Sequence, residues 1–246
     1  QHHHAHVASC MAEHRLSGPV IGVAFDGTGL GPDKTIWGGE FLVADFARYE
    51  RRAHLRYVPL AGGDAAIRQP WRLALSYLRD ALGSAAALPD LPGWQELDGK
   101  KIRLVQSMMR QGINSVPTSS CGRLFDAVSA ILGVSHEASY EGQAAIKLEG
   151  VALKGVQESY SFDIRGGTPM EIDLRATIRA LVVDALAPVT SQLAGTALTQ
   201  QAGKDWLTFV PIAPDALPEP VMDHFVEAGE YPAPDGHPAH HFLTTR

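Results

Sequence analysis

The chain has 246 residues, enough for one sizeable domain or for two small lobes around a cleft. Its formal net charge of −6 at pH 7 argues against broad binding to nucleic acid. It shows neither an apolar run of about 18 residues nor a secretory signal, and its two cysteines outline no disulfide framework, so we expect a cytoplasmic protein without a membrane span.

Helical and extended patterns alternate through the first third of the chain. The periodicity predicts a helix at 1–16, strands at 19–25 and 41–44, an extended stretch at 54–60, and a helix at 65–82 interrupted near Pro70. Glycines between 27 and 31 predict a loop between the first two strands, which we expect to pair as a hairpin. This alternation is typical of an α/β protein.

The rest of the chain is predicted to be mostly helical and then irregular. We expect a surface connection at 84–94, a loop at 114–120, and helices at 101–110, 122–132, 144–148 and 170–186. Beyond about residue 188 prolines multiply and the apolar periodicity fades, which predicts irregular and partly disordered chain.

The opening sequence Gln1-His2-His3-His4-Ala5-His6 suggests a metal site. In a helix, His2 and His6 project from one face, one turn apart, where two imidazoles can share one ion. A purification tag is the alternative interpretation of a terminal histidine run. Ala5 interrupts the run, however, and the following residues continue a helical pattern, which favours a native segment.

A carboxylate follows the first strand, in Asp26-Gly27-Thr28-Gly29. An aspartate at a strand end can hold a divalent metal, and glycines let backbone N–H groups approach a phosphate closely. A strand, a hairpin and a helix with early glycines describe one lobe of an actin-like ATPase fold. Together with the histidine pair, this pattern indicates an enzyme that handles a nucleotide or an acyl phosphate.

Seven motifs in order extend this pattern to a known family. They are His2-His3-His4-Ala5-His6, Asp26-Gly27-Thr28-Gly29, Trp37-Gly38-Gly39-Glu40, Gly62-Gly63-Asp64, Pro70-Trp71-Arg72, Ser119-Ser120-Cys121-Gly122-Arg123-Leu124-Phe125-Asp126 and Tyr140-Glu141-Gly142-Gln143-Ala144-Ala145. Over about residues 1–165 the chain resembles the C-terminal, TsaD-like (Kae1-like) domain of the HypF carbamoyltransferases. O-carbamoyltransferases are related to the same family.

The resemblance implies a set of site residues. His2, His6 and Asp26 would ligate a divalent metal, iron or zinc, with magnesium as an alternative. The nucleotide-binding candidates are Gly27, Thr28 and Gly29 at the phosphate and Gly122, Asp126 and Gly142 near the nucleoside. Besides Asp26, the catalytic candidate is Arg72; it and Arg123 are cations that could contact phosphate or carbamoyl oxygens, with a surface salt bridge as the alternative.

The implied reaction belongs to the maturation of NiFe-hydrogenases. In the family, a separate YrdC-like domain makes carbamoyl-adenylate from carbamoyl phosphate and ATP, and the TsaD-like domain passes the carbamoyl group to the C-terminal cysteine of HypE. The expected partners are therefore a HypE-like acceptor, carbamoyl phosphate and ATP, without nucleic acid or membrane. Since no upstream domains are present, we expect this length alone not to make the adenylate.

The chain departs from the family toward its C-terminus. The family's Gly-Gly-Val loop has no match in this chain, and Asp235-Gly236 matches only part of the family's Asp-Gly-Gly motif. We therefore expect a recognisable first lobe and an incomplete or divergent second lobe, with a domain at 1–187 and a tail at 188–246. The alternatives are a non-catalytic remnant that binds a metal or a partner, an O-carbamoyltransferase, an actin-like kinase, and a hydrolase built on Cys121.

Overall fold

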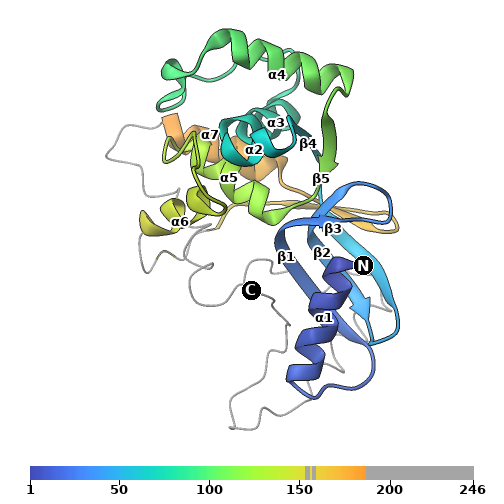
Figure 1. Cartoon of the computed structure of the whole chain (residues 1–246). Coiled ribbons are helices and arrows are strands. Elements are labelled where there is room, and N and C mark those ends of the chain that lie inside the picture. The colour runs from blue at the N-terminus through green and yellow to red at the C-terminus, as the bar shows by residue number, and fades with distance from the viewer. Residues whose placement is uncertain (153–155, 157–158, 187–246) are drawn as a thin grey trace.

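The protein folds as a mixed sheet with helices packed on it (Figure 1). The computed structural model describes residues 1–152, 156 and 159–186. In chain order the elements are α1 (His2–Glu13), β1 (Val20–Leu30), β2 (Ile36–Ala44), β3 (Tyr49–Leu55), β4 (Val58–Ala61), α2 (Asp64–Arg68), α3 (Trp71–Leu82), the 3-10 turn η1 (Trp94–Glu96), α4 (Gly99–Gln111), β5 (Ser115–Thr118), α5 (Cys121–Ile131), α6 (Gln143–Gly150), β6 (Asp163–Arg165), β7 (Met170–Asp173) and α7 (Arg175–Leu186). Within these ranges, no helix combines the length and the apolar character that crossing a membrane requires.

The described strands form one seven-stranded sheet in the order β4-β5-β2-β3-β7-β6, with β1 also paired to β2. Strands β1, β2 and β3 run antiparallel to their neighbours in this group, as do β4 with β5 and β6 with β7. Strand β7 lies parallel to β3, and β5 lies parallel to β2. The α/β class expected from the sequence is confirmed by this mixed sheet.

The predicted hairpin is formed by β1 and β2, but its glycine segment is part of a strand. Pairing runs from Val20 to Phe25, is interrupted, and resumes where Gly29 lies opposite Trp37. The expected separate loop at Gly27 to Gly31 is therefore wrong for the residues up to Leu30. An irregular stretch of this kind bends a strand and re-aims its side chains, and it places Asp26 at the bend.

The main core lies where α3, α5 and α7 pack on one another and on the sheet (Figure 1). Leu73 and Leu78 of α3, Ile131 of α5, Leu181 of α7 and Ile172 of β7 are almost completely buried. Burying an aliphatic side chain of this size stabilises a fold by about 1.5–3 kcal/mol. Val23 of β1 and Phe41 of β2 belong to the same core as Cys121 of α5, so the N-terminus of α5 packs against the β1–β2 hairpin.

A smaller core fixes α1 on the hairpin. Val7 and Met11 of the helix are completely buried and pack in a cluster with Leu42 and Ala44 of β2. The helix approaches β1 closely because Gly22 has no side chain: a Cβ at Gly22 would lie 2.4 Å from Val7 Cγ2. The histidines at the start of α1 are thereby held over the end of β1.

Two predicted elements are corrected by the sheet. The expected loop at 114–120 contains β5, in which Val116 pairs with Leu60. The strand forms although Pro117 has no backbone N–H to donate. The expected single helix at 170–186 begins as β7, whose Met170 pairs with Ala53, and only then continues as α7. In both cases pairing with a distant strand outweighs the local pattern. The irregular tail predicted beyond residue 188 lies outside the described residues.

Candidate metal centre

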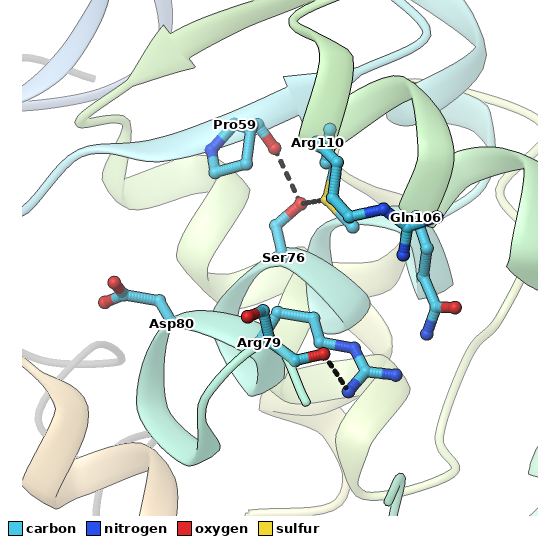
Figure 2. Close-up of a pocket in the computed structure, with 8 residues that line it drawn as sticks. Pro59, Ser76, Arg79, Asp80, Gln106 and Arg110 are labelled. Atoms are coloured by element: carbon cyan, nitrogen blue, oxygen red, sulfur yellow. Dashed lines mark hydrogen bonds between the residues drawn. The ribbon is translucent and has the colours of Figure 1, made fainter. Parts of the chain in front are cut away.

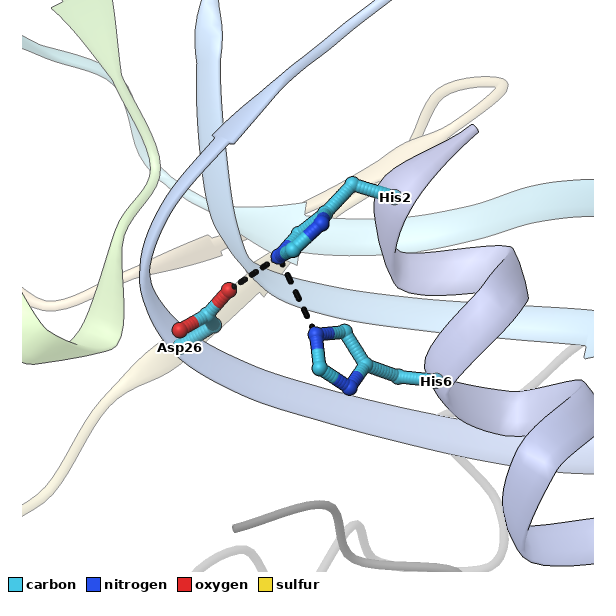
Figure 3. A group of neighbouring side chains, drawn as sticks. All are labelled: His2, His6 and Asp26. Atoms are coloured by element: carbon cyan, nitrogen blue, oxygen red, sulfur yellow. Dashed lines mark hydrogen bonds and ion pairs between the residues drawn. The ribbon is translucent and has the colours of Figure 1, made fainter.

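Three predicted ligands converge at the start of α1 and the bend of β1 (Figure 3). His2 Nε2 lies 2.8 Å from Asp26 Oδ2 and 3.0 Å from His6 Nε2. One ligand atom from each of the three residues lies within 4.8 Å of the other two. The convergence expected from the sequence is thus present; the binding of a metal there stays a prediction.

The first turn of α1 determines the positions of the His2 and His6 imidazoles. Gln1 caps the helix, its side-chain Oε1 accepting the backbone N–H of His4 at 3.0 Å. His2 and His6 then share one face, with ring centroids 4.4 Å apart and planes 89° apart. Because the small core fixes α1 on β2, both rings face the strand that carries Asp26.

Electrostatics favour the protonation states that a metal needs. The His3 ring contributes most to lowering the pKa of Asp26 well below its ordinary value, and Gly27 N–H and His2 add to this effect against the opposing influence of burial. Burial, followed by the proximity of His2, lowers the pKa of His6. At neutral pH the site therefore offers an ionised carboxylate and a neutral imidazole. Two imidazole nitrogens and one carboxylate oxygen form a donor set that suits zinc or ferrous iron.

The glycines after Asp26 have different surroundings. A Cβ at Gly29 would lie 2.3 Å from His3 Cε1 and 2.8 Å from His2 Cδ2, so this glycine makes room for the imidazoles. At Gly27 the nearest side-chain atoms would lie 3.6 Å away, and Thr28 is exposed. Gly27 therefore has the space for a ligand, whereas Gly29 is explained without one; contact of these residues with phosphate stays a prediction.

Helix α5 begins against this turn. A Cβ at Gly122 would lie 2.8 Å from Gly27 Cα, so the two backbones touch. Asp126, one turn further along α5, is buried, and its Oδ2 lies 3.2 Å from Arg123 Nη1. Burial raises the pKa of Asp126 to about 6, with Arg123 opposing and Glu141 adding to the rise. The structure thus brings Gly122 to the glycine turn, with Asp126 one helical turn away along α5. A role of either residue at a nucleoside stays a prediction.

Gly142 lies at the N-terminus of α6 with φ +78°, a conformation that favours glycine. The preceding residue, Glu141, approaches the turn of β1, since its Oε1 would lie 3.6 Å from a Cβ at Gly27. Among the described residues, and apart from its chain neighbours and its own helix, no heavy atom lies within 4 Å of where a Gly142 Cβ would be. This segment therefore borders the turn, but a role of Gly142 at a nucleoside stays a prediction.

Arg123 is an unusual cation beside the turn. It is only 3 % exposed, and its Nε and Nη1 make no hydrogen bond within the described part of the chain. Its Nη2 would lie 3.6 Å from a Cβ at Gly27. Asp126 Oδ2, 3.2 Å from Nη1, compensates part of the buried charge, whereas Nε has no acceptor among the described residues. A buried guanidinium donor without an acceptor is costly unless an anion supplies one. Of the two arginines singled out in the sequence, this one has the surroundings of a ligand contact.

Arg72 lies elsewhere in the fold. Its Nε donates to Gln69 Oε1 at 2.6 Å, and its Nη1 is 3.5 Å from the carbonyl oxygen of Ala61. Burial lowers the pKa of this guanidinium. These contacts belong to the connection between β4 and α3, and none of them is to the triad; the catalytic role suggested for Arg72 stays a prediction without support from its contacts.

The thiol that could have been a nucleophile is unsuited to that role. Cys121 is 6 % exposed, and burial raises the pKa of its thiol to about 12. A thiol rather than a thiolate is therefore present at neutral pH. This argues against the hydrolase hypothesis and favours a packing role for Cys121 at the start of α5.

A cavity of about 230 Å³ opens between α3, α4 and β4 (Figure 2). Two of its polar side chains bond to the protein itself: Ser76 Oγ donates to the carbonyl oxygen of Pro59 at 2.6 Å, and Arg79 Nη1 donates to that of Ser84 at 3.0 Å. None of its lining residues belongs to the triad or to the α5 turn. The candidate site is therefore the polar cluster formed by α1 and β1, and this cavity is separate from it.

Sequence reasoning missed two polar groups that shape the site. His3 was named only within the opening motif and not as a site residue, but its ring is completely buried and its Nε2 lies 3.5 Å from Asp26 Oδ2. Ser120 was noted only within a motif, yet its hydroxyl lies 2.8 Å from the carbonyl oxygens of both Asp26 and Gly27. A serine immediately before a helix is a recognisable capping signal, but its second role depends on tertiary contact.

A mixed α/β domain in which a helical histidine pair faces a strand carboxylate defines the class: a domain with a candidate metal centre beside a glycine turn. The sequence model of the family described as "Carbamoyltransferase, Kae1-like Domain, second subdomain" matches residues 22–204. The chain belongs to this family, the Kae1-like domain of the HypF carbamoyltransferases. The resemblance inferred from the motifs is confirmed; the predicted boundary at 187 lies inside the matched range and stays a prediction.

Curated relatives and solved structures agree with this assignment. Carbamoyltransferase HypF2 of Cupriavidus necator is 45% identical over 157 residues, which cover 62% of this chain and 18% of the relative. Carbamoyltransferase HypF of Rhodobacter capsulatus is 46% identical over 156 residues, which cover 62% of this chain and 20% of the relative. A crystal structure of full-length HypF in a phosphate- and nucleotide-bound form is similar with TM-score 0.72 and 36% identity, covering 81% of this chain and 26% of that one. HypF of T. kodakarensis is similar with TM-score 0.67 and 32% identity, covering 82% and 27%. The chain thus spans about a fifth to a quarter of these proteins.

Proposed function

We propose that this chain holds the carbamoyl-transfer site of a HypF-type carbamoyltransferase, acting in the maturation of NiFe-hydrogenases in the cytoplasm. Its substrates would be carbamoyl-adenylate, made from carbamoyl phosphate and ATP, and the C-terminal cysteine of a HypE-like acceptor. The observation that carries the proposal is the convergence of His2, His6 and Asp26 within 4.8 Å. Their arrangement beside a glycine turn, in a chain of this family, supports a divalent metal at a phosphate site.

The fold supports a particular architecture for this site. A hairpin with a bend, followed by a helix whose N-terminus touches the bend, is the arrangement of a phosphate-binding lobe in actin-like ATPases. We place the described residues in the first lobe of such a fold. The N-terminus of α5 then contributes backbone N–H groups and a favourable helix dipole to an anion at Gly27.

The chain's own residues can prepare the transfer. Arg123 provides a buried positive charge beside Gly27 for anionic oxygens, and Asp26 and the two imidazoles form the ligand set. A divalent ion held there would supply Lewis acidity, which polarises a carbamoyl oxygen and stabilises charge on a departing phosphate.

The nucleophile is proposed to come from the acceptor. The acceptor sulfur bonds to the carbamoyl carbon, the bond between that carbon and the phosphate oxygen breaks, and its electron pair leaves with AMP. The thiol proton passes to solvent. This assignment is consistent with Cys121, whose buried thiol has a raised pKa and is unsuited to attack.

The test separates transfer from mere binding. The full chain is titrated with Zn(II) and then with AMP or ATP, and carbamoyl transfer is assayed with adenylate supplied by a YrdC-like domain and with a HypE-type acceptor. The proposal predicts one metal per chain, nucleotide binding, and carbamoylation that a chelator removes. Metal binding without nucleotide binding or transfer would instead identify a non-catalytic remnant, and absence of metal binding would refute the proposal.

A further inference from the structure

We propose that His3 is a positioning residue that holds the Asp26 carboxylate in the orientation for ligating a metal; this inference rests on the proposed metal centre. His3 is completely buried at the start of α1. Its Nε2 makes no hydrogen bond within the described part of the chain, yet it lies 3.5 Å from Asp26 Oδ2. A buried N–H without an acceptor is destabilising, so this atom needs an explanation.

The hydrogen bonds of Gln1 fix which nitrogen of His3 carries the proton. Gln1 Oε1 accepts the N–H of His4 at 3.0 Å, which sets the orientation of the amide. Gln1 Nε2 then donates to His3 Nδ1 at 3.2 Å, so Nδ1 is the acceptor. In a neutral imidazole the proton is therefore on Nε2, and this N–H faces the carboxylate of Asp26.

The ring of His3 has little freedom to turn away. It stacks on Trp37, with ring centroids 6.4 Å apart and planes 21° apart. On another side the backbone of Gly29 is so close that a Cβ there would lie 2.3 Å from His3 Cε1. Trp37 is itself fixed, because its Nε1 donates to Asp33 Oδ1 at 3.0 Å. The imidazole is thus a rigid donor.

Asp26 needs such a donor once His2 acts as a ligand. His2 Nε2 is the atom that contacts Asp26 Oδ2 at 2.8 Å, and an Nε2 that binds a metal no longer donates to the carboxylate. Gly27 N–H holds the other oxygen, Oδ1, at 2.6 Å. His3 is then the side chain placed to hold Oδ2. Hydrogen bonds to ligating carboxylates typically change metal affinity by about 10- to 100-fold.

The test compares two replacements of His3 in the full chain. His3→Phe keeps an aromatic ring but removes the donor, whereas His3→Gln keeps an N–H near the position of Nε2. Zn(II) affinity is measured by competition with a chromophoric chelator, and unfolding is followed by circular dichroism without metal. We expect His3→Phe to weaken Zn(II) binding by about 10- to 100-fold with one site retained, and His3→Gln to restore most of the affinity.

Several outcomes would overturn the inference. Equal affinity of His3→Phe and the wild type would show that His3 only packs, and would leave the metal centre intact. Loss of the site in both variants would make His3 a ligand. If the wild type binds no Zn(II), the proposed function fails and this inference with it. Independently of any variant, nitrogen NMR of the wild-type imidazole should show the proton on Nε2; a proton on Nδ1 contradicts the proposal.

Discussion

Ser120 holds the backbone of β1 at Asp26 and Gly27. Its hydroxyl lies 2.8 Å from the carbonyl oxygens of both Asp26 and Gly27, and the same oxygen accepts the N–H of Arg123 at 3.1 Å. One side chain therefore caps α5 and fastens the helix to the bend of β1. The cluster of His2, His6 and Asp26 and the buried cation Arg123 share this fixed point, so two segments distant in sequence lie together.

Removing this fastening should destabilise the fold. Ser120→Ala removes a helix cap and leaves buried carbonyl oxygens with one donor fewer, which should lower the free energy of unfolding by about 1–3 kcal/mol. Ser9→Ala is the matched control because Ser9 is exposed on α1. Urea unfolding measures both variants. Equal midpoints for the two would show that Ser120 contributes nothing beyond an exposed serine.

Gly29 should be intolerant of any side chain. Gly29→Ala places a Cβ 2.3 Å from His3 Cε1 and 2.8 Å from His2 Cδ2, so the imidazoles must move. We expect a loss of about 1–3 kcal/mol in stability and at least a tenfold weaker affinity for Zn(II). Gly150→Ala serves as the control, since no described residue beyond its own helix and chain neighbours lies within 4 Å of its Cβ position. Unchanged Zn(II) binding in Gly29→Ala would contradict the geometry of the triad.

Glu40 should be essential to the hairpin. It is completely buried, and its Oε2 accepts Arg51 Nε at 2.5 Å, while its Oε1 accepts Ser119 Oγ at 2.5 Å. Glu40→Ala removes the nearer carboxylate of Arg51 and leaves only the more distant Asp33 Oδ2, 3.7 Å from Nη1. Loss of this buried partner should cost about 3–5 kcal/mol. Glu50→Ala removes a more exposed partner of Arg52 and should cost less than about 1 kcal/mol. Thermal unfolding distinguishes the two; similar losses would refute this account.

Asp126 should give the stability of the domain a pH dependence of unusual sign. Its pKa is raised from 3.8 to about 6 by burial, with Arg123 opposing and Glu141 adding to the rise. The folded state then holds the proton more tightly than the unfolded state, so this residue lowers stability as pH rises from about 4 to 6. The loss amounts to about 2 kcal/mol, and Asp126→Asn should remove that slope. Parallel pH profiles of the wild type and the variant would show that the carboxyl is not perturbed.

The sequence predicted the parts of the site that depend on local spacing. The four-residue interval between His2 and His6 places both on one helix face, and the position of Asp26 after an apolar stretch places it at the bend of β1. Sequence could not show that Gly29 accommodates imidazoles or that His3 is buried against Trp37. Those facts follow from the packing of α1 on the hairpin, which involves residues far apart in the chain.

The fold was predictable to a similar extent. The amphipathic helices α3 and α5 and the hairpin were recognisable, because their apolar periodicity matches their buried faces. The strands β5 and β7 were missed, because each is four residues long and is defined by pairing with a distant strand. Short strands of this kind carry too little pattern to outweigh the neighbouring loop or helix signal.

Zn(II) titration of the full chain tests the central claim most directly, with the His2→Ala, His6→Ala double variant and a His14→Ala control. His14 follows α1 and is exposed, so its loss should leave binding unchanged. The account predicts one tightly bound ion per chain in the wild type and in the control, and an affinity at least 100-fold weaker in the double variant. Equal binding by the double variant and the wild type, or no binding by either, would contradict it.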